Sequence, residues 1–529
     1  MLISDNFEAD WNGTTQHLSS TAALAATLPT ASLVKDQQPP APATTVIAKV
    51  ITGDNRMDPL IDDASYRFND GSPVGTAVTV TFSFPTTMPS SYTGEDALDW
   101  KPFSAVQQAA TREILAMLQQ QTRLTFQEVT EPATVSGTMR FGNNTQTTSA
   151  GYALLPNSTK TDRDADTWMA SGAGTPVVIG DYTWQTLVHE IGHAIGLNHP
   201  GNYNAGESKN ADAVGNFLSA NEDAFFNSIM SYRQSAQDIN AIWFMPYDML
   251  TLRYLYGKTD YGMGDTAYTY TDTIGTLVTN IVDDGGIDTL NFLAVTAGVT
   301  LNLTPGAYSS VGKTAAGANA LANLTIALDA TIEKAIGTAM ADTMLGNAAN
   351  NSFTGGSGDD TLDGAAGADT AVYSGERASY TVTLGGASVT VAGGTEGADT
   401  LTSIERLQFS DTKVGLDRLR EVLAKASCCG AVVFGTLAVA RRGMWASACR
   451  FLIQARPTSS WLRLASVGTF LTAGGDVVTM LRTNLSALTT VNKAAAPIVA
   501  LLGGALTVGA LTVRRPTEHK VPAVSTWLA

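Results

Sequence analysis

Hydrophobic and polar residues between positions 46 and 257 follow both strand and helix spacing. "TAVTVTFSF" alternates as a half-buried strand does, and "LTFQEV" and "GTMRFGN" predict two more short strands. "DALDWKPFSAVQQAATREILAMLQQQT" places apolar residues at helical spacing, and so does "DYTWQTLVHEIGHAIGL", where Asp181 or Thr183 offers an N-cap. "PYDMLTLRYLYG" starts with proline and ends with glycine, which predicts a closing helix. We therefore expect a mixed α and β domain over residues 46–257.

After Gly257 the spacing changes to short strand-like runs separated by Gly, Asp and Asn turns. Glycines 337, 346, 355 and 364 recur every nine residues, and each is followed five positions later by Asp342, Asn351, Asp360 or Asp369. Two positions further on stand Met344, Phe353, Leu362 and Ala371. A turn of the form GGxGxD followed by a short strand is typical of a parallel β-roll. We expect this all-β domain over residues 258–416.

The two ends of the chain differ from these domains in composition. Residues 1–45 contain "QQPPAPATT" and are expected to be a flexible leader or pro-segment, or a plain disordered terminus. The first twenty residues have neither the positive nor the apolar region of a Sec signal peptide. Export of the chain would therefore need another route.

Residues 417–529 form a basic, apolar tail. They hold 13 basic and 4 acidic residues, whereas residues 1–416 hold 19 and 44. Three interpretations stay open: an appended domain or membrane-associating hairpin, an unusually long export region, or a translated sequence that has left its reading frame. The long uncharged run at 496–513 contains Pro497 and three glycines, so it is a poor membrane span.

Charge and cysteine content narrow the classes of partner and compartment. The net charge of −16 opposes nucleic acid as a general partner. All three cysteines lie in the tail, so the acidic body has no disulfide available. A secreted form would need another stabilising element.

Three of the five histidines lie between residues 189 and 199, in "HEIGHAIGLNH". His189 and His193 are four residues apart, so on a helix they share a face and can bind one Zn²⁺. Gly196 can adopt a positive φ, which lets the chain turn back and bring His199 as a third ligand. Glu190 would lean over the open position of the metal and take a proton from water. The competing interpretation is a set of core histidines on a helix face.

These residues, with the continuation "HPGNYNAGE" and the later "SIMSYR", resemble the metzincin metallopeptidases of family M10, and most of all the secreted bacterial serralysins. The resemblance covers about residues 46–417 and includes "MRFGN", "YLYG" and the nine-residue repeats. It implies that Met230 forms a tight turn beneath the histidines, and that Tyr232 is an extra zinc ligand that stabilises the reaction intermediate. Without the resemblance, Met230 is a core methionine and Tyr232 a partly buried aromatic residue.

The repeats predict calcium sites, because their turns combine inward carbonyl groups with carboxylates, the oxygen ligands that Ca²⁺ prefers. From the repeats the predicted ligand positions are Asp342, Gly355, Gly356, Gly358, Asp360, Gly364, Gly367 and Asp369. The resemblance adds Asp265, Asp283, Gly285, Gly286, Asp288, Thr331 and Glu333. "GTAMADTML" and "GNAANNSFT" lack the glycine pair, so we expect fewer filled sites than in a full-length roll. Turns without metal, and plain surface carboxylates, are the alternatives.

The sequence therefore predicts an α+β metzincin zinc-protease domain, a calcium-binding roll of the RTX type and an atypical tail. The expected function is that of a secreted endopeptidase, monomeric, with one catalytic Zn²⁺ and several structural Ca²⁺, acting on proteins or peptides. The resemblance names a bacterial type I export machinery and a small protein inhibitor as candidate partners. Two rivals are a zinc hydrolase of non-peptide substrates and a calcium-dependent secreted binding or adhesion protein with a decayed protease site.

Overall fold

The computed structural model describes residues 15–17, 52–61, 65–131, 138–146, 149–171, 177–201, 217–233, 237, 239–420, 470–471 and 477–478. They divide into a larger unit, within residues 1–377 and 393–414, and a smaller one, within 378–392 and 415–529. The expected leader and nearly all of the expected tail, including residues 496–513, lie outside the described residues. No helix in the described part of the chain is long and apolar enough to cross a membrane.

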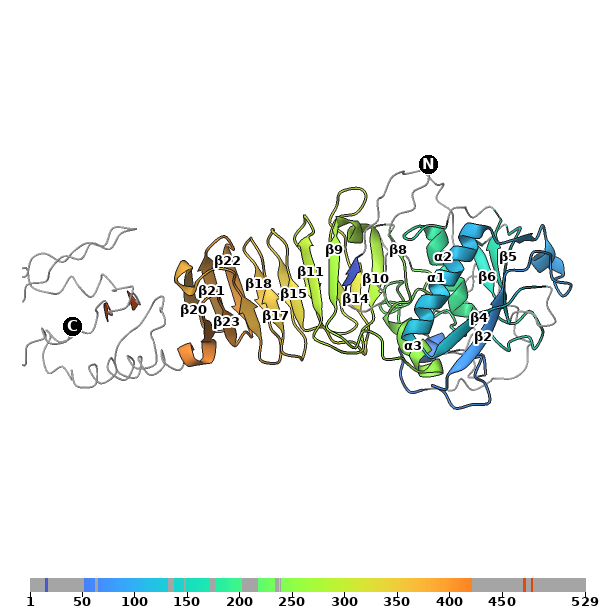
Figure 1. Ribbon diagram of the computed structural model, residues 1–529, viewed down its shortest axis with the longest axis horizontal. Coiled ribbons are helices and arrows are strands. Elements are labelled where there is room, and N and C mark those ends of the chain that lie inside the picture. Colours follow the sequence, from blue (N-terminus) through green and yellow to red (C-terminus); the bar gives the residue numbers. More distant parts are fainter. Residues whose placement is uncertain are drawn as a thin grey trace, which may run out of the picture. The chain divides into compact units, whose positions relative to one another are not determined.

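One mixed sheet forms the amino-terminal part of the larger unit (Figure 1). Its strands, in spatial order, are β4 (Leu124–Glu128), β2 (Val78–Ser83), β5 (Met139–Asn144), β7 (Thr167–Ala170) and β6 (Gly151–Ala153), and β3 (Lys101–Pro102) pairs with β5. β2 runs parallel to β4 and β5, β5 runs parallel to β7, and β6 runs antiparallel to β7. The three strands predicted from "TAVTVTFSF", "LTFQEV" and "GTMRFGN" are thereby confirmed.

Three α-helices accompany this sheet, and all three were predicted: α1 (Ala105–Gln121), α2 (Tyr182–Ala194) and α3 (Pro246–Tyr256). α1 packs on β4, and α2 packs on β6, β7 and α1. Ser104 and Gln107 form a capping box at the start of α1. Asp181 occupies the N-cap position of α2, but its side chain makes no capping hydrogen bond. Short 3-10 turns are η1 (Asp58–Leu60), η2 (Gly94–Ala97), η3 (Asp272–Thr276) and η4 (Arg377–Ser379).

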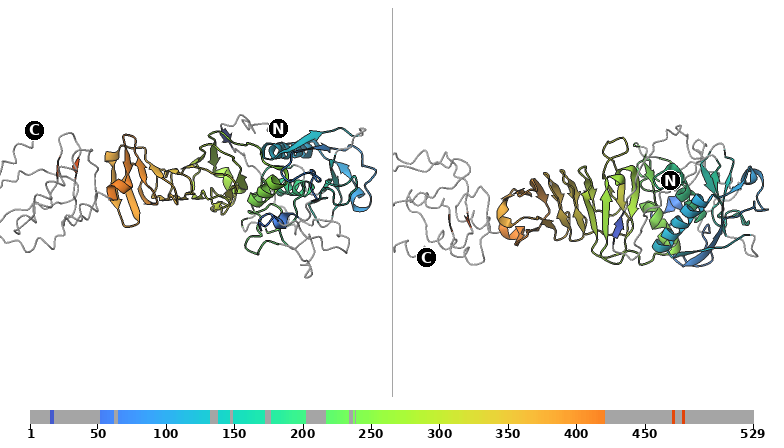
Figure 2. Two further views of the ribbon diagram at one scale, coloured as in Figure 1. Left: turned by 90° about the horizontal axis from the view of Figure 1, so that it is seen from below. Right: turned by 45° about the horizontal axis from the view of Figure 1, so that its top comes forward.

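After α3 the chain is built from short strands in two parallel sheets, which we call the two-sheet segment (Figures 1 and 2). One sheet contains, in order, β9 (Ala267–Thr271), β11 (Thr289–Ala294), β15 (Lys334–Ile336), β17 (Ser352–Thr354), β19 (Thr370–Val372) and β23 (Arg406–Gln408). The other contains β12 (Thr300–Asn302), β16 (Thr343–Leu345), β18 (Thr361–Asp363) and β22 (Ala398–Thr402).

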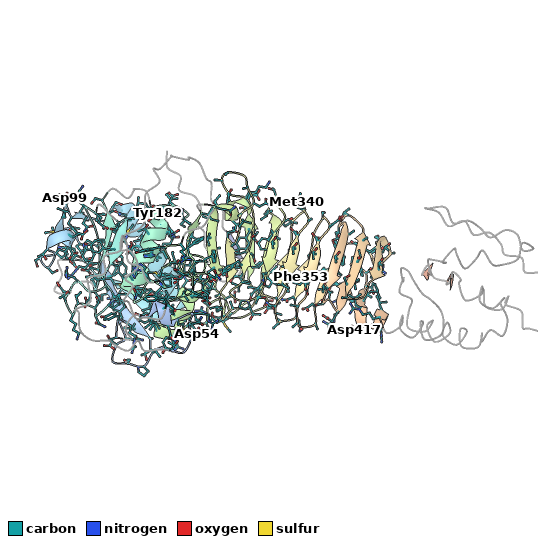
Figure 3. All side chains as sticks on the ribbon, turned by 180° about the vertical axis from the view of Figure 1, so that it is seen from behind. Asp54, Asp99, Tyr182, Met340, Phe353 and Asp417 are labelled. Carbon is teal, nitrogen blue, oxygen red and sulfur yellow. The ribbon has the colours of Figure 1, made fainter. Side chains whose placement is uncertain are left out.

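The nine-residue repeats alternate between these sheets. Met344 in β16 pairs with Leu362 in β18, whereas Phe353 in β17 pairs with Ala371 in β19. All four side chains are buried, and Figure 3 marks Phe353 within the segment. Strands of one sheet therefore come from repeats eighteen residues apart, and equivalent turns stack directly on one another.

Further strands complete the described chain. β13 (Tyr308–Ser309), β14 (Leu324–Ile326), β10 (Leu277–Ile281) and β8 (Asn240–Ala241) form a four-stranded sheet, and β1 (Thr15–His17) pairs with β9. β20 (Tyr380–Leu384), β21 (Ser388–Gly393) and β24 (Lys413–Gly415) follow, as does a separate pair of β25 (Phe470–Leu471) and β26 (Val477–Val478). Because β8 precedes α3 and pairs with β10, the four-stranded sheet joins the parts of the chain before and after α3.

Candidate metal centres

The three predicted histidines lie together in the structure. The Nε2 atoms of His193 and His199 are 3.1 Å apart, and those of His199 and His189 are 3.3 Å apart. A tetrahedral zinc ion with Zn–N bonds of about 2.0–2.1 Å requires ligand nitrogens about 3.3 Å apart. The three side chains are buried, and each offers a nitrogen within 4.8 Å of the others. The cluster therefore fits a zinc ion without rearrangement.

Backbone carbonyl groups set the orientation of two of these rings. The Nδ1 atom of His189 lies 2.8 Å from the carbonyl oxygen of Ile229, and that of His193 lies 2.7 Å from the carbonyl oxygen of Leu197. A carbonyl oxygen only accepts hydrogen bonds, so Nδ1 carries the proton in both rings. The lone pair of each Nε2 is then free to bind a metal.

A glycine turn brings His199 to the other two histidines, as the sequence predicts. α2 ends at Ala194, and Gly196 has φ +104°. A Cβ atom at this position would lie 2.4 Å from the carbonyl oxygen of Tyr66. The hydroxyl of Tyr256 donates to the carbonyl oxygen of Ile195 at 2.8 Å and so satisfies one of the last carbonyl groups of the helix. Only glycine combines the required φ with the close backbone contact.

Glu190 is a residue of α2, and its fully buried side chain lies on the side of the helix that packs against the edge strand β6. A Cβ atom added to Gly151 in β6 would lie 2.9 Å from Cγ of Glu190 and 3.0 Å from its Oε1. Gly151 was not predicted as a site residue; a glycine opening a short strand was the available signal. Tyr182, labelled in Figure 3, lies at the start of α2. Burial and, to a smaller extent, the charge on Glu190 raise its pKa to about 12.

Met230 and Tyr232 lie next to the histidines. The Sδ atom of Met230 would be 2.7 Å from a Cβ atom on Gly192, the helical residue between His189 and His193. The ring centroid of Tyr232 lies 4.5 Å from that of His199 and 6.0 Å from that of His189. Gly192 is a second residue that the sequence analysis missed, although an isolated glycine in a helical pattern signals close packing.

Asp248, in the first turn of α3, holds the segment that contains Met230. Its carboxylate accepts hydrogen bonds from the Ser228 hydroxyl at 2.6 Å, from the backbone of Ile229 at 2.7 Å and from the backbone of Met245 at 2.8 Å. Burial raises the pKa of Asp248 to about 7. The carbonyl oxygen of Ile229 also accepts a hydrogen bond from His189. Asp248 is therefore linked to the histidine cluster through a single residue, Ile229. No local sequence pattern indicated this role.

A second group of predicted ligands gathers where β9 and β11 begin. The carboxyl group of Asp283 accepts a hydrogen bond from Tyr268 at 2.6 Å, and Asp288 accepts one from the backbone of Thr266 at 2.8 Å. Burial raises the pKa of both carboxyl groups above the usual range of an aspartate. The Oδ2 atom of Asp288 is buried and has no hydrogen-bond partner among the described residues. Such an oxygen suits a bound cation.

The other residues predicted for this group come from the adjoining segments, and three of them, Asp265, Gly286 and Thr331, are exposed. Asp265 accepts from the backbone of Ile287 at 2.9 Å, and Glu333 accepts from the backbone of Asp288 at 2.9 Å. Gly285 and Gly286 have φ of +155° and +136°, and a Cβ atom on Gly286 would lie 2.4 Å from the carbonyl oxygen of Gly264. Thr331 is exposed on the segment that leads to Glu333.

The repeat turns place their acidic residues in two stacks. Asp342, Asp360 and Asp399 form one stack, in which the backbone of Asp342 donates to Asp360 at 2.8 Å and that of Asp360 donates to Asp399 at 3.0 Å. Asp369 belongs to the other stack and accepts from the backbone of Asn351 at 2.6 Å. Burial raises the pKa of Asp360 to about 7 and that of Asp369 to about 6. Both have a buried Oδ2 atom without a hydrogen-bond partner in the described chain.

The predicted glycines permit the close stacking of these turns. Gly356, Gly358 and Gly367 have positive φ, and a Cβ atom on Gly356 would lie 1.9 Å from the carbonyl oxygen of Thr338. Gly355 and Gly364 lie directly over the carboxylates of Asp360 and Asp369 in their own turns. By contrast, both oxygens of Asp342 accept backbone hydrogen bonds, from Thr338 and Val299, each at 2.7 Å.

Comparison with known proteins gives two family matches in series. Residues 54–243 match the model of metallo-peptidase family M12, and residues 253–412 match that of the peptidase M10 serralysin C terminal. The first match thus names M12, whereas the sequence resemblance named M10 for both regions. The join between them falls near the start of α3.

Several curated proteins are similar to the chain. Metallopeptidase AprA of Pseudomonas marginalis is 31% identical over 54% of this chain and 63% of its own length. Serralysin of Photorhabdus laumondii is 28% identical over 58% of this chain and 64% of its own length. Serralysin C of Dickeya chrysanthemi is 35% identical over 31% of this chain and 36% of its own length. The chain thus spans less than two thirds of the length of these relatives. The chain is thus similar to the serralysin metallopeptidases over residues 54–412, and its three-histidine cluster lies within the first of the two matched regions.

Proposed function

We propose that the protein is a zinc-dependent endopeptidase with its catalytic domain over residues 46–257. The observation that carries the proposal is the zinc-compatible spacing of His189, His193 and His199 beside the buried Glu190. When bound, zinc supplies a Lewis acid that polarises the scissile carbonyl group and makes a water molecule more acidic. Three protein nitrogens leave a fourth position open, as in catalytic rather than structural zinc sites.

Glu190 and Tyr232 would perform the proton transfer and the charge stabilisation. Glu190 takes a proton from the attacking water and passes it to the leaving amine. The ring of Tyr232 lies beside that of His199, and its hydroxyl would donate a hydrogen bond to the oxygen that gains negative charge. Met230 packs against Gly192 beneath the histidines and would hold the helix in place.

The position of β6 favours a peptide over other substrates. β6 ends the order of its sheet among the described residues, and Gly151 in this strand lies against Glu190. An edge strand can pair with an extended peptide through backbone hydrogen bonds. A peptide bound along β6 would bring a peptide bond close to Glu190. A binding or adhesion protein with a decayed protease site is less well supported, because Glu190 and all three ligands are present together.

We further propose that residues 258–416 form a calcium-binding β-roll that stabilises an extracellular enzyme. The Oδ2 atoms of Asp288, Asp360 and Asp369 support this, because they are buried and have no partner within the described ranges, and a buried carboxylate oxygen without a donor favours a cation. Calcium is abundant outside cells and would replace the disulfides that the acidic body lacks. The export machinery, the inhibitor and the monomeric state stay predictions.

The substitution Glu190→Ala tests the catalytic proposal. Zinc content, measured by atomic absorption, should equal that of the wild type, because Glu190 is not a ligand. Casein hydrolysis should fall at least about 100-fold, as expected for loss of a general base. Glu128→Ala is the matched control, since Glu128 is an exposed glutamate of the same domain. Unchanged hydrolysis by the zinc-loaded Glu190→Ala protein would contradict the mechanism.

A further inference from the structure

The turn formed by residues 346–351, "GNAANN", differs chemically from the other repeat turns. It stacks on the segment that ends at Glu333, whose carbonyl oxygen accepts from the backbone of Ser352 at 2.8 Å. The turn contains Asn347 and Asn351, which are 6% and 1% exposed. In the turns at 355–360 and 364–369 the last position is an aspartate instead.

The two asparagine amides donate hydrogen bonds into the gap between the turn and the preceding segment. Nδ2 of Asn347 donates to the carbonyl oxygens of Ile332 at 2.8 Å and Leu303 at 3.2 Å. Nδ2 of Asn351 donates to the carbonyl oxygens of Ile332 at 3.3 Å and Glu333 at 3.4 Å. Backbone carbonyl groups that face this gap therefore already have donors.

The acceptor ends of both amides are occupied as well. Oδ1 of Asn351 accepts from the backbone of Asn347 at 2.8 Å, and Oδ1 of Asn347 accepts from the backbone of Ala349 at 2.8 Å. Rotating either amide by half a turn would put NH₂ against N–H and oxygen against oxygen. The orientation is thus determined by the surrounding backbone.

The aspartate turns show the opposite pattern. Asp360 and Asp369 are 1% and 0% exposed, and each keeps a buried Oδ2 atom without a hydrogen-bond partner in the described residues. A carboxylate has no proton to donate, so it cannot supply the donors that the two asparagine amides supply, and a bound cation would take their place beside the unpartnered oxygen. The turn at 346–351 needs no cation, because the NH₂ groups of its two asparagines donate hydrogen bonds to the carbonyl groups that face it.

We infer that the turn at 346–351 is closed without metal, with the side-chain amides of Asn347 and Asn351 in place of a calcium ion. This inference rests on the calcium-binding part of the proposed function and deepens it. The two stacks of turns then differ in their need for calcium, and part of the stack that contains Asn351 stays paired when calcium is removed. A single change, Asn351→Asp, replaces the donor of residue 351 with oxygen and produces an oxygen-rich gap that Ca²⁺ would fill.

The test compares Asn351→Asp with Asn350→Asp in the full chain. Asn350 is exposed, and its Oδ1 atom accepts from the backbone of Ala368 at 2.8 Å, a bond that an aspartate retains. Bound calcium is counted by equilibrium dialysis with metal analysis, and the unfolding temperature is measured in calcium and in chelator. Asn351→Asp should bind one more Ca²⁺ per chain and lose more stability in chelator. Asn350→Asp should match the wild type in both measurements.

Asn351→Ala decides the question even if Asn351→Asp does not fold. An unchanged calcium count in Asn351→Ala supports the inference, because residue 351 is then not a ligand. One calcium ion fewer overturns it, as does an unchanged count in a folded Asn351→Asp protein. A wild-type chain that binds no calcium overturns the calcium-binding proposal itself and this inference with it.

Discussion

At the scale of single residues, glycines allow the candidate zinc site to be close-packed. Gly151 leaves room for Glu190, and Gly192 leaves room for Met230. Gly196 provides both the positive φ and the contact with the Tyr66 carbonyl group that place His199. The proposed ligands and the proposed acid–base residue are thus packed against neighbours that have no side chain.

Gly192→Ala should weaken zinc binding and lower the unfolding temperature. Alanine favours a helix over glycine by about 1 kcal/mol, but a Cβ atom 2.7 Å from Met230 Sδ forces that side chain to move. Overpacking of this kind costs about 1–3 kcal/mol, so the contact outweighs the helix preference. Zinc affinity is read by competition with a chelator.

Met230→Ala provides the internal control for that variant. In its background the 2.7 Å contact is gone and the closest remaining one is with Cε1 of Phe244 at 3.2 Å, so Gly192→Ala should cost clearly less than in the wild type. The explanation fails if Gly192→Ala costs the same in both backgrounds.

At the scale of elements, α3 connects the zinc cluster to the two-sheet segment. Asp248 in its first turn holds the backbone beside Met230. Arg253 in its last turn is buried and binds both carboxylate oxygens of Asp284 at 2.8 and 3.1 Å and Asp329 at 2.7 Å. Asp284 follows Asp283, a predicted calcium ligand. One helix therefore contacts the supports of both candidate metal centres.

The free energy of unfolding should depend on pH through Asp248. Its pKa is about 7 in the folded chain, because of burial, and about 4 in an unfolded chain. Between these values the folded protein retains a proton that the unfolded chain has released. The stability contributed by this group therefore falls as the pH rises from about 4 to 7, by at most about 1.4 kcal/mol per pH unit.

Urea unfolding at pH 5, 6, 7 and 8 tests this dependence. Asp248→Asn stays uncharged, so its stability should fall less steeply with pH than that of the wild type. Asp70→Asn, a change at an exposed carboxylate, should leave the slope unaltered. Parallel curves for the wild type and Asp248→Asn would show that the buried carboxyl group does not titrate in this range.

At the scale of the whole molecule, calcium would stabilise a cysteine-free body through the two-sheet segment. Ligand binding to the folded state alone adds about 2.7 kcal/mol at a concentration 100 times the dissociation constant. Each turn closed by an ion contributes separately, so loss of one site should reduce the total without unfolding the chain.

Asp360→Asn should therefore bind one Ca²⁺ fewer and gain less stability from added calcium. Asp359→Asn is the matched control, because Asp359 is exposed and its Oδ1 atom accepts a hydrogen bond from the backbone of Ala398 at 2.8 Å, which an asparagine retains. Calcium counts and unfolding temperatures in calcium and in chelator give the comparison. Equal counts in Asp360→Asn and the wild type would exclude Asp360 as a ligand.

The sequence by itself determined the parts of this protein that depend on local spacing. Helix periodicity and a glycine at position 196 place three histidines on one turn-and-helix unit, and the nine-residue period determines short strands and turns. These features involve residues close together along the chain, so pattern and backbone sterics are sufficient to predict them.

Tertiary structure alone decided which distant residues support these units. Met230 lies beneath Gly192, Asp248 holds the backbone at Ile229, and repeats eighteen residues apart become neighbours while adjacent repeats separate into two sheets. The same packing gives Asn351 its carbonyl partners and leaves Asp360 and Asp369 each with an oxygen that has no partner in the part of the chain that the structure describes. These contacts join residues that are far apart in the sequence, and they form only when the separate segments pack together. The local spacing of residues along the chain therefore does not predict them.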